Sequence, residues 1–199
     1  MHFPYSVSRG WEAKTSPVAD EPQVTDPYPL AGVANQHWQT GTVQHTVVVI
    51  TDIYAPPAVI FDLELDMDEH SASLHATDEV AVTSTGRSTL GEGDEVSFTA
   101  RHFGWRFSMT SRITQYNRPY SFTDEQVRGP FAAMQHEHVF DDQPGGWTRM
   151  HDRFTVTAPF GVLGHLALRL AVGPYLRRLL EQRAAHIKTR AEAGTPFTE

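Results

Sequence analysis

Two histidines on one predicted strand are the residues best placed to do chemistry in this sequence. His136 and His138 are two positions apart, so in a strand both side chains point to the same face of a sheet. The expected register places Asp152 opposite His136, where its carboxylate can orient the imidazole through a ring N–H. His102, near the end of another predicted strand, joins the same face. These four side chains form the principal candidate site.

Three interpretations of this cluster are open. In the first, His136 and Asp152 form an acid/base pair for enolisation or dehydration of a bound ketone, which makes them candidate catalytic residues. In the second, His136, His138 and His102 bind a metal ion with a carboxylate. The chain has no cysteine and no helical His-x-x-x-His motif, so we assign no metal and no cofactor. In the third, the cluster is a structural polar network or forms hydrogen bonds to a ligand without turnover.

Arg128 is a further candidate whose orientation the pattern leaves open. If Ile113 pairs with Phe122, the strand face that carries Arg128 turns inward, where the guanidinium needs a partner such as Asp124 or Asp152 and suits a carboxylate or enolate oxygen. The opposite orientation places Val127 and Thr123 inside instead. The acidic stretch 62–70 lacks the glycine and terminal glutamate of a calcium loop and is typical of a solvated helix face.

Composition excludes several classes of protein. The 199 residues carry a net charge of -8, which argues against a nucleic-acid partner. The absence of cysteine excludes disulfides and favours the cytoplasm. The first residues lack the pattern of a signal peptide, and the most apolar segment, 160–172, is too short and too interrupted by charge for a membrane span.

The candidate residues lie within a regular succession of predicted elements. A proline-rich irregular arm, 1–41, precedes a domain over 42–192, and a tail follows at 193–199. The domain opens with a β-branched strand from Val43 to Ile50 and continues with short helices near 58–65 and 68–74. Six strands follow, at about 78–84, 94–103, 105–116, 120–128, 133–140 and 147–157. Turn signals separate most of them.

The turns predict a pairing for two of the hairpins. A tight turn at Gly104 sets His102 opposite Phe107, and the Pro-Gly-Gly turn at 144–146 sets Phe140 opposite Thr148. In both hairpins the apolar residues then share one face, as a half-buried sheet requires.

A long helix from Phe160 to Ala191 ends the domain. It carries a continuous apolar stripe, with a kink expected near Leu170 to Gly173 because Pro174 lacks a backbone N–H. The stripe is Leu163, Leu166, Leu170, Gly173, Leu176, Leu180, Ala184 and Ile187.

This order of elements resembles the helix-grip fold of the START-like (SRPBCC) superfamily, also called the polyketide cyclase/dehydrase and lipid-transport superfamily. The residues that carry the resemblance are Ile53-Tyr54-Ala55-Pro56 before Val59-Ile60-Phe61-Asp62, Leu90 to Val96, Ile113 with Arg118-Pro119, Gly129-Pro130-Phe131, His136-Glu137-His138-x-Phe140, Met150-x-Asp152 and Ala158 to Gly164. The resemblance spans about 43–188 and is strongest to a small bacterial branch. It implies an α+β fold in which a seven-stranded antiparallel sheet wraps a long C-terminal helix, with two short helices after the first strand. Members include lipid carriers, hormone receptors, cyclases and ring hydroxylases, so no common catalytic set can be transferred.

A cavity between sheet and helix is the site that this resemblance implies. The residues expected to line it are Phe98, His102, Phe107, Met109, Ile113, Phe122, Arg128, His136, His138, Met150, Asp152, Leu166 and Leu170. We therefore expect a cytoplasmic protein that binds or carries a hydrophobic small molecule of lipid, quinone or polyaromatic type. The alternatives are a cyclase- or dehydratase-type enzyme that uses His136 and Asp152, and a protein-interaction module whose partner is unknown.

Overall fold

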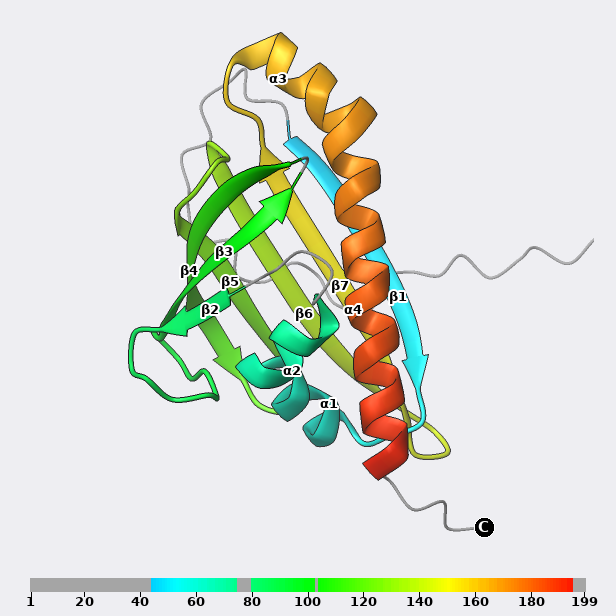
Figure 1. Cartoon of the computed structure of the whole chain (residues 1–199). Coiled ribbons are helices and arrows are strands. Elements are labelled where there is room, and N and C mark those ends of the chain that lie inside the picture. The colour runs from blue at the N-terminus through cyan, green and yellow to red at the C-terminus, as the bar shows by residue number, and fades with distance from the viewer. Residues whose placement is uncertain (1–43, 75–79, 103, 195–199) are drawn as a thin grey trace, which may run out of the picture. The chain divides into compact units, whose positions relative to one another are not determined.

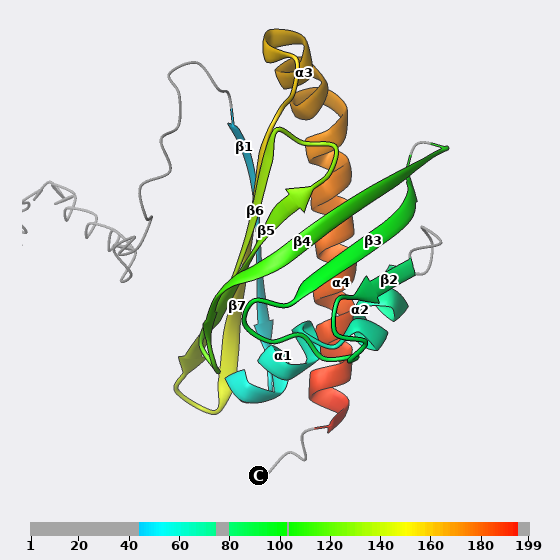
Figure 2. The same ribbon diagram turned by 90° about the vertical axis from the view of Figure 1, so that its left-hand side faces the viewer.

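One antiparallel sheet, curved around a long helix, forms the framework of the domain (Figures 1 and 2). The structure is a computed structural model that describes residues 44–74, 80–102 and 104–194. The strands follow the order β1-β7-β6-β5-β4-β3-β2 across the sheet. Their bounds are β1 Gln44–Ile53, β2 Val80–Thr83, β3 Glu95–His102, β4 Trp105–Asn117, β5 Ser121–Arg128, β6 Ala133–Gln143 and β7 Trp147–Thr157. The predicted helix-grip architecture is confirmed. The predicted arm 1–41 lies outside the described residues.

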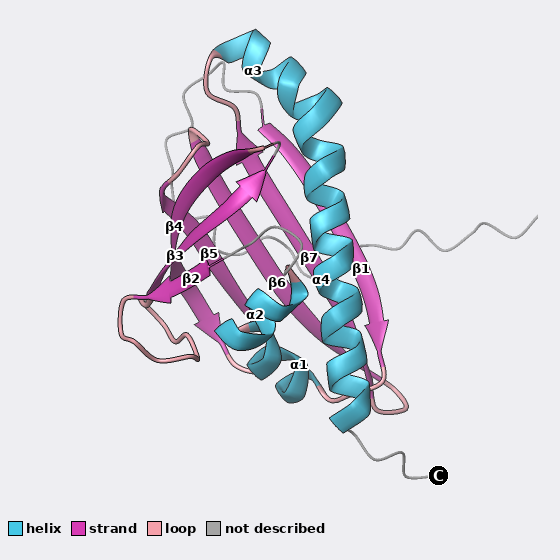
Figure 3. Ribbon diagram, in the orientation of Figure 1, coloured by secondary structure: helices cyan, strands magenta, loops and turns pink. Residues whose placement is uncertain are grey.

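The helices lie on the same face of the sheet (Figure 3). After β1 come α1, Pro57–Glu64, with a proline in its first turn, and α2, Met67–Ser73, whose N-cap Asp66 accepts hydrogen bonds from the N–H groups of Asp68 and Glu69. After β7 come α3, Gly161–Ala167, the π-helical turn η2, Leu168–Val172, and α4, Gly173–Gly194. Helix α4 packs against β1, α1 and α2. Within the described residues, no helix combines the length and the hydropathy needed to span a bilayer.

The aromatic core joins α1 to the sheet. Phe61 is fully buried and makes edge-to-face contacts with Tyr116, Phe122 and Phe140 at centroid distances of 5.2, 5.5 and 5.7 Å. Such pairs add about 0.5 to 1.5 kcal/mol each beyond the area they bury. This core fixes α1 on the inner face of the sheet.

The predicted helical stripe is correct only downstream of Gly173. Leu180, Ala184 and Ile187 are buried, whereas Leu166 and Leu170, expected to face the sheet, are 52% and 69% exposed. The irregularity expected near Pro174 is the turn η2, whose wider hydrogen-bonding pattern rotates the helix face. Leu168, 3% exposed, takes the inward position instead.

The predicted pairing in both hairpins was wrong by two residues. Phe140 lies opposite Met150 rather than Thr148, because the β6–β7 turn is centred on Gly145 with its positive φ of 96°. His138, and not His136, is therefore opposite Asp152. In the other hairpin His102 lies opposite Trp105, not Phe107. A shift of two positions leaves every side chain on its predicted face.

A β-bulge decides the orientation of Arg128. Gln126 pairs with Ser111 but Arg128 pairs with Thr110, so Val127 is an extra residue in β5. Ile113 lies opposite Asp124 rather than Phe122. The bulge moves Arg128 off the inner face, and its side chain is exposed. The inward orientation considered from the sequence is thus wrong.

Candidate functional site

A cavity of about 340 Å³ lies between the β3–β4 part of the sheet and the C-terminal helices. Its lining is almost wholly apolar and includes several phenylalanines. The lining residues are Phe98, Ala100, His102, Phe107, Met109, Pro130, Phe131, Pro159, Phe160, Gly164, Ala167, Leu168, Val172, Tyr175, Leu176 and Leu179. A cavity of this size and lining is at the small end of the range of known small-molecule sites, about 300 to 1,000 Å³.

One pair of polar side chains interrupts the apolar wall. His102 Nδ1 and Tyr175 Oη form a hydrogen bond of 2.8 Å, which joins the end of β3 to α4. Among the described residues of the lining, these two alone have side chains that carry nitrogen or oxygen atoms. The hydroxyl and the imidazole provide a donor and an acceptor in this part of the wall.

Exposed apolar side chains occur in the cavity wall and on the helical segment that contributes to it. Phe160, which lines the cavity from the start of α3, is 88% exposed, and Phe107 is 38% exposed. On the adjoining helix, Val162, Leu163, Leu166 and Leu170 are all more than half exposed.

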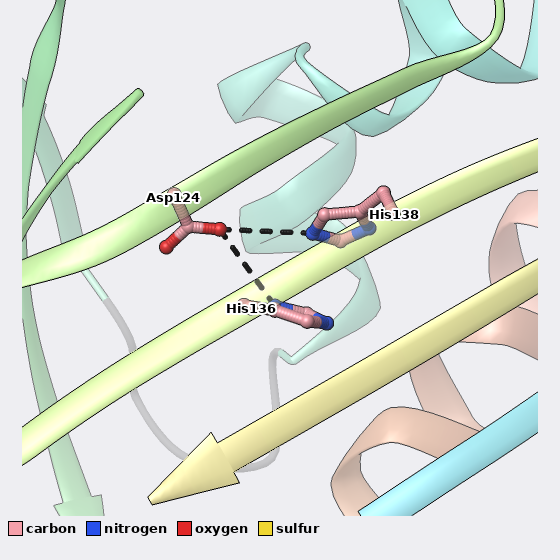
Figure 4. A group of neighbouring side chains, drawn as sticks. All are labelled: Asp124, His136 and His138. Atoms are coloured by element: carbon pink, nitrogen blue, oxygen red, sulfur yellow. Dashed lines mark ion pairs between the residues drawn. The ribbon is translucent and has the colours of Figure 1, made fainter. Parts of the chain in front are cut away.

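A cluster of buried charged and polar side chains lies elsewhere on the inner face, on β5, β6 and β7. His138 Nδ1 is 2.9 Å from Asp152 Oδ1, and His138 Nε2 is 3.6 Å from Asp124 Oδ2. His136 lies between the same carboxylates: its Nε2 is 3.5 Å from Asp152 Oδ1 and its Nδ1 is 3.8 Å from Asp124 Oδ2. Figure 4 shows both imidazoles turned toward Asp124. None of these four residues lines the cavity.

An arginine from α4 completes the cluster. Arg183 Nη2 is 2.5 Å from the carboxylate of Glu64 on α1 and donates a hydrogen bond of 2.8 Å to the Glu64 carbonyl oxygen. Its Nη1 donates to His70 Nδ1 at 2.7 Å. The His70 ring stacks on Phe98, a lining residue of the cavity, with 4.6 Å between centroids. The cluster thus reaches the cavity wall through His70.

The electrostatics separate the two histidines of β6. Burial opposes protonation of His138, but the carboxylates of Asp124 and Asp152 outweigh it and raise its pKa to about 9. Burial, helped by the charge on His138, lowers the pKa of His136. Burial acts to raise the pKa values of Asp124 and Asp152, but the two imidazoles reverse this and lower both. His138 is therefore the protonated partner and His136 the neutral one.

The residues expected at the site fall into four groups. Phe98, His102, Phe107 and Met109 line the cavity. Ile113, Phe122 and Met150 are buried in the core, with His138 stacked on Phe122 at 4.1 Å between centroids. His136, His138 and Asp152 belong to the polar cluster. Arg128, Leu166 and Leu170 are exposed.

Among the polar residues of the cavity wall and the cluster, Tyr175, Glu64, His70 and Arg183 were not expected from the sequence, and Asp124 was considered only as a partner of Arg128. The pattern contained a signal for two of them. Glu64 follows Ile60 by four positions and Arg183 follows Leu180 by three, so each lies on the buried face of its helix. The expectation of a solvated face for the acidic stretch is wrong at Glu64, which is 1% exposed.

Comparison with known proteins places this geometry in a family. The family model described as polyketide cyclase / dehydrase and lipid transport matches residues 44–192. Among solved structures, the protein TTHA0849 from Thermus thermophilus is similar with a TM-score of 0.63 at 18% identity, over 76% of this chain and 100% of that one. The Zhui aromatase/cyclase from a Streptomyces species gives 0.61 at 16% identity, over 77% and 100%. Ara h 8.0201 gives 0.53 at 16%, over 74% and 99%. No curated protein matches.

Proposed function

The chain belongs to the polyketide cyclase/dehydrase and lipid transport family, and we propose that it binds an apolar small molecule in the cavity between the β3–β4 part of the sheet and the C-terminal helices. The observation that supports this proposal is the lining itself, which is apolar except for His102 and Tyr175. Removing apolar surface from water contributes roughly 25 cal/mol per Å². A molecule that fills such a cavity is held mainly by this term.

The polar pair indicates what kind of molecule fits. His102 and Tyr175 offer hydrogen bonds in one part of the wall, so we expect a ligand with an oxygen at one position and an apolar body elsewhere. Phe98, Phe107 and Phe131 offer aromatic faces to that body. A lipid, a quinone or a polyaromatic compound meets this description. We propose that residues 42–192 form the binding domain and that it acts in the cytoplasm.

Mass spectrometry of the native protein, followed by solvent extraction, tests this function directly. An apolar compound that copurifies in about equimolar amount is the expected result. A matched pair of variants links it to the cavity: Ala167→Trp places a large ring at a lining position, whereas Ala185→Trp places it on an exposed position of α4. The first variant is expected to lose the ligand and the second to keep it. Equal retention in both would contradict the proposal, and no bound compound in the wild type would favour an interaction module.

Proton transfer to the bound molecule is a second candidate function, favoured by the 2.8 Å contact of Tyr175 with His102. A phenol held by a protonated imidazole can donate its proton to a ligand oxygen and take one from the ring, which is left neutral, a contribution of about 10²- to 10⁴-fold in rate. The cluster of His136, His138 and Asp152 supports this role less well, because none of them lines the cavity. Tyr175→Phe separates the two functions: a carrier keeps an unchanged ligand, while an enzyme accumulates unconverted substrate.

A further inference from the structure

We propose that Asp124, His136 and His138 bind a divalent metal ion of the zinc type, a site independent of the proposed ligand cavity. Asp124 Oδ2 is 3.6 Å from His138 Nε2 and 3.8 Å from His136 Nδ1. One ligand atom from each residue lies within 4.8 Å of the other two, and the carboxylate faces both imidazoles across neighbouring strands (Figure 4). With bonds of about 2.0 to 2.2 Å, two ligands of a tetrahedral ion are roughly 3.4 Å apart. The side chains therefore need only a small movement to reach this geometry.

Asp152 is placed to orient both imidazoles when a metal ion binds. Its Oδ1 lies 2.9 Å from His138 Nδ1 and 3.5 Å from His136 Nε2, the two ring nitrogens that face away from Asp124. When the ion binds, His138 releases its second proton, and the proton that each imidazole keeps on the nitrogen facing Asp152 leaves the other two lone pairs directed toward Asp124. Metal-bound histidines in proteins almost always donate their second ring N–H in this way. One buried carboxylate thus positions two ligands.

The contacts of the two imidazoles with Asp152 are close but are not well-formed hydrogen bonds in the structure. His136 Nε2, His138 Nδ1 and Asp152 Oδ1 are fully buried, yet none makes a hydrogen bond of good geometry with any described residue. The side chains of His136 and Asp152 are 6% and 2% exposed. Buried polar groups nearly always have hydrogen-bond partners, so three neighbouring buried atoms without one require an explanation. An ion that pulls both imidazoles into a defined orientation supplies one.

The charge balance of the cluster also favours a divalent cation. Its acidic groups are Glu64, Asp124 and Asp152, and among the described residues Arg183 is its one permanent cation. Arg183 pairs with Glu64, which leaves two carboxylates shared by two imidazoles. These two carboxylates have no permanent cation of their own among the described residues of the cluster, and an uncompensated buried charge costs several kcal/mol. A divalent ion compensates both.

The neighbouring set of Glu64, His138 and Asp152 is a poorer alternative. Its ligand atoms also lie within 4.8 Å of one another, but the Glu64 carboxylate already forms an ion pair with the guanidinium of Arg183. Imidazole nitrogens with a carboxylate suit zinc, iron, nickel or copper better than calcium or magnesium. The 15% exposure of the Asp124 side chain marks the side from which an ion can enter. The sequence argument against a metal relied on the missing helical motif and the absence of cysteine, and a site made of two histidines on one strand and a carboxylate needs neither.

Zinc titration of the full-length, chelator-treated chain tests the proposal. We expect about one equivalent of tightly bound zinc after gel filtration, measured by elemental analysis, and a rise in melting temperature. Asp124→Asn should lose this equivalent, and Asp152→Asn should weaken affinity about 10- to 100-fold. His151→Gln is the matched control, because His151 on β7 pairs with Asp141 outside the cluster and should retain the zinc.

Cobalt(II) spectroscopy uses the wild-type chain, so its result does not depend on whether the variants fold. Cobalt(II) bound to the wild-type chain should show the intense visible bands of a four-coordinate ion, and zinc should displace it. Absence of both tight zinc and these bands in the wild-type chain would overturn the proposal. So would loss of zinc in Glu64→Gln with retention in Asp124→Asn, because the ion would then occupy the neighbouring set.

Discussion

The charge of Glu64 is the most informative single feature of the cluster to remove. Its side chain is 0% exposed and its carboxylate pairs with Arg183, which is 11% exposed. Glu64→Gln keeps the volume and removes the charge. Arg183 then retains its bonds to the Glu64 carbonyl and to His70 but loses the carboxylate that compensates its charge.

The expected loss in the free energy of unfolding is about 3 to 5 kcal/mol, the usual cost of breaking a buried ion pair from one side. Arg183→Met should cost at least as much, because the Glu64 carboxylate then loses its cation. The double variant should cost clearly less than the sum of the two, since no unpaired charge remains. A loss of this size is a large fraction of the total stability of a domain, about 5 to 15 kcal/mol.

Urea unfolding at pH 7, followed by circular dichroism with chelator present, measures all four proteins of this cycle. The control cycle uses Asp62 and Arg118, an exposed pair that includes a residue of the same helix α1, with contacts of 2.9 and 2.7 Å. Its coupling should be small, because water and salt screen exposed pairs. If the two cycles give equal coupling energies, burial does not govern the Glu64–Arg183 pair and our account of the cluster is wrong.

Stability measurements also test three other features: the helix phase, the charge of His138 and the N-terminal boundary of the domain. Leu168→Ala should lower the free energy of unfolding by about 2 to 5 kcal/mol, because Leu168 is buried. Leu166→Ala, on the exposed side of the helix, should change it by less than about 0.5 kcal/mol in the same urea assay. Equal effects of the two substitutions would contradict the helix phase described above. In the chelator-treated protein, the raised pKa of His138 means that the folded state holds an extra proton between about pH 6.5 and pH 9. The stabilisation from His138 should therefore be complete below about pH 6.5 and fall by on the order of 3 kcal/mol up to pH 9. His138→Gln should lack this fall, and an unchanged slope would assign it to another group. Removal of residues 1–41 should leave cooperative thermal unfolding and ligand retention intact; loss of cooperativity would place part of the core before residue 42.

Much of the fold follows from the sequence because it depends on periodic patterns. Alternation of apolar and polar residues placed Phe98, His136 and Asp152 on the inner face, and all three lie there. The stripe of α4 after Gly173 is also correct, since an uninterrupted α-helix keeps one period. These predictions use only local geometry.

Register and helix phase, in contrast, depended on tertiary structure. A shift of two residues leaves every side chain on the same face, so the pattern cannot decide whether Asp152 is opposite His136 or His138. The bulge at Val127 and the turn η2 each change the phase by local backbone hydrogen bonds, which turned Arg128, Leu166 and Leu170 outward.

The sequence by itself therefore determined the element order, the inner face and the presence of two histidines and an aspartate on that face. Only the tertiary structure decided that Asp124, from the neighbouring strand β5, faces both imidazoles, and that Glu64 and Arg183 meet from helices more than a hundred residues apart in the chain. The physical reason is that contacts between distant elements depend on how the elements pack, and a charged residue on an apolar helix face is stable there only if the fold supplies its partner.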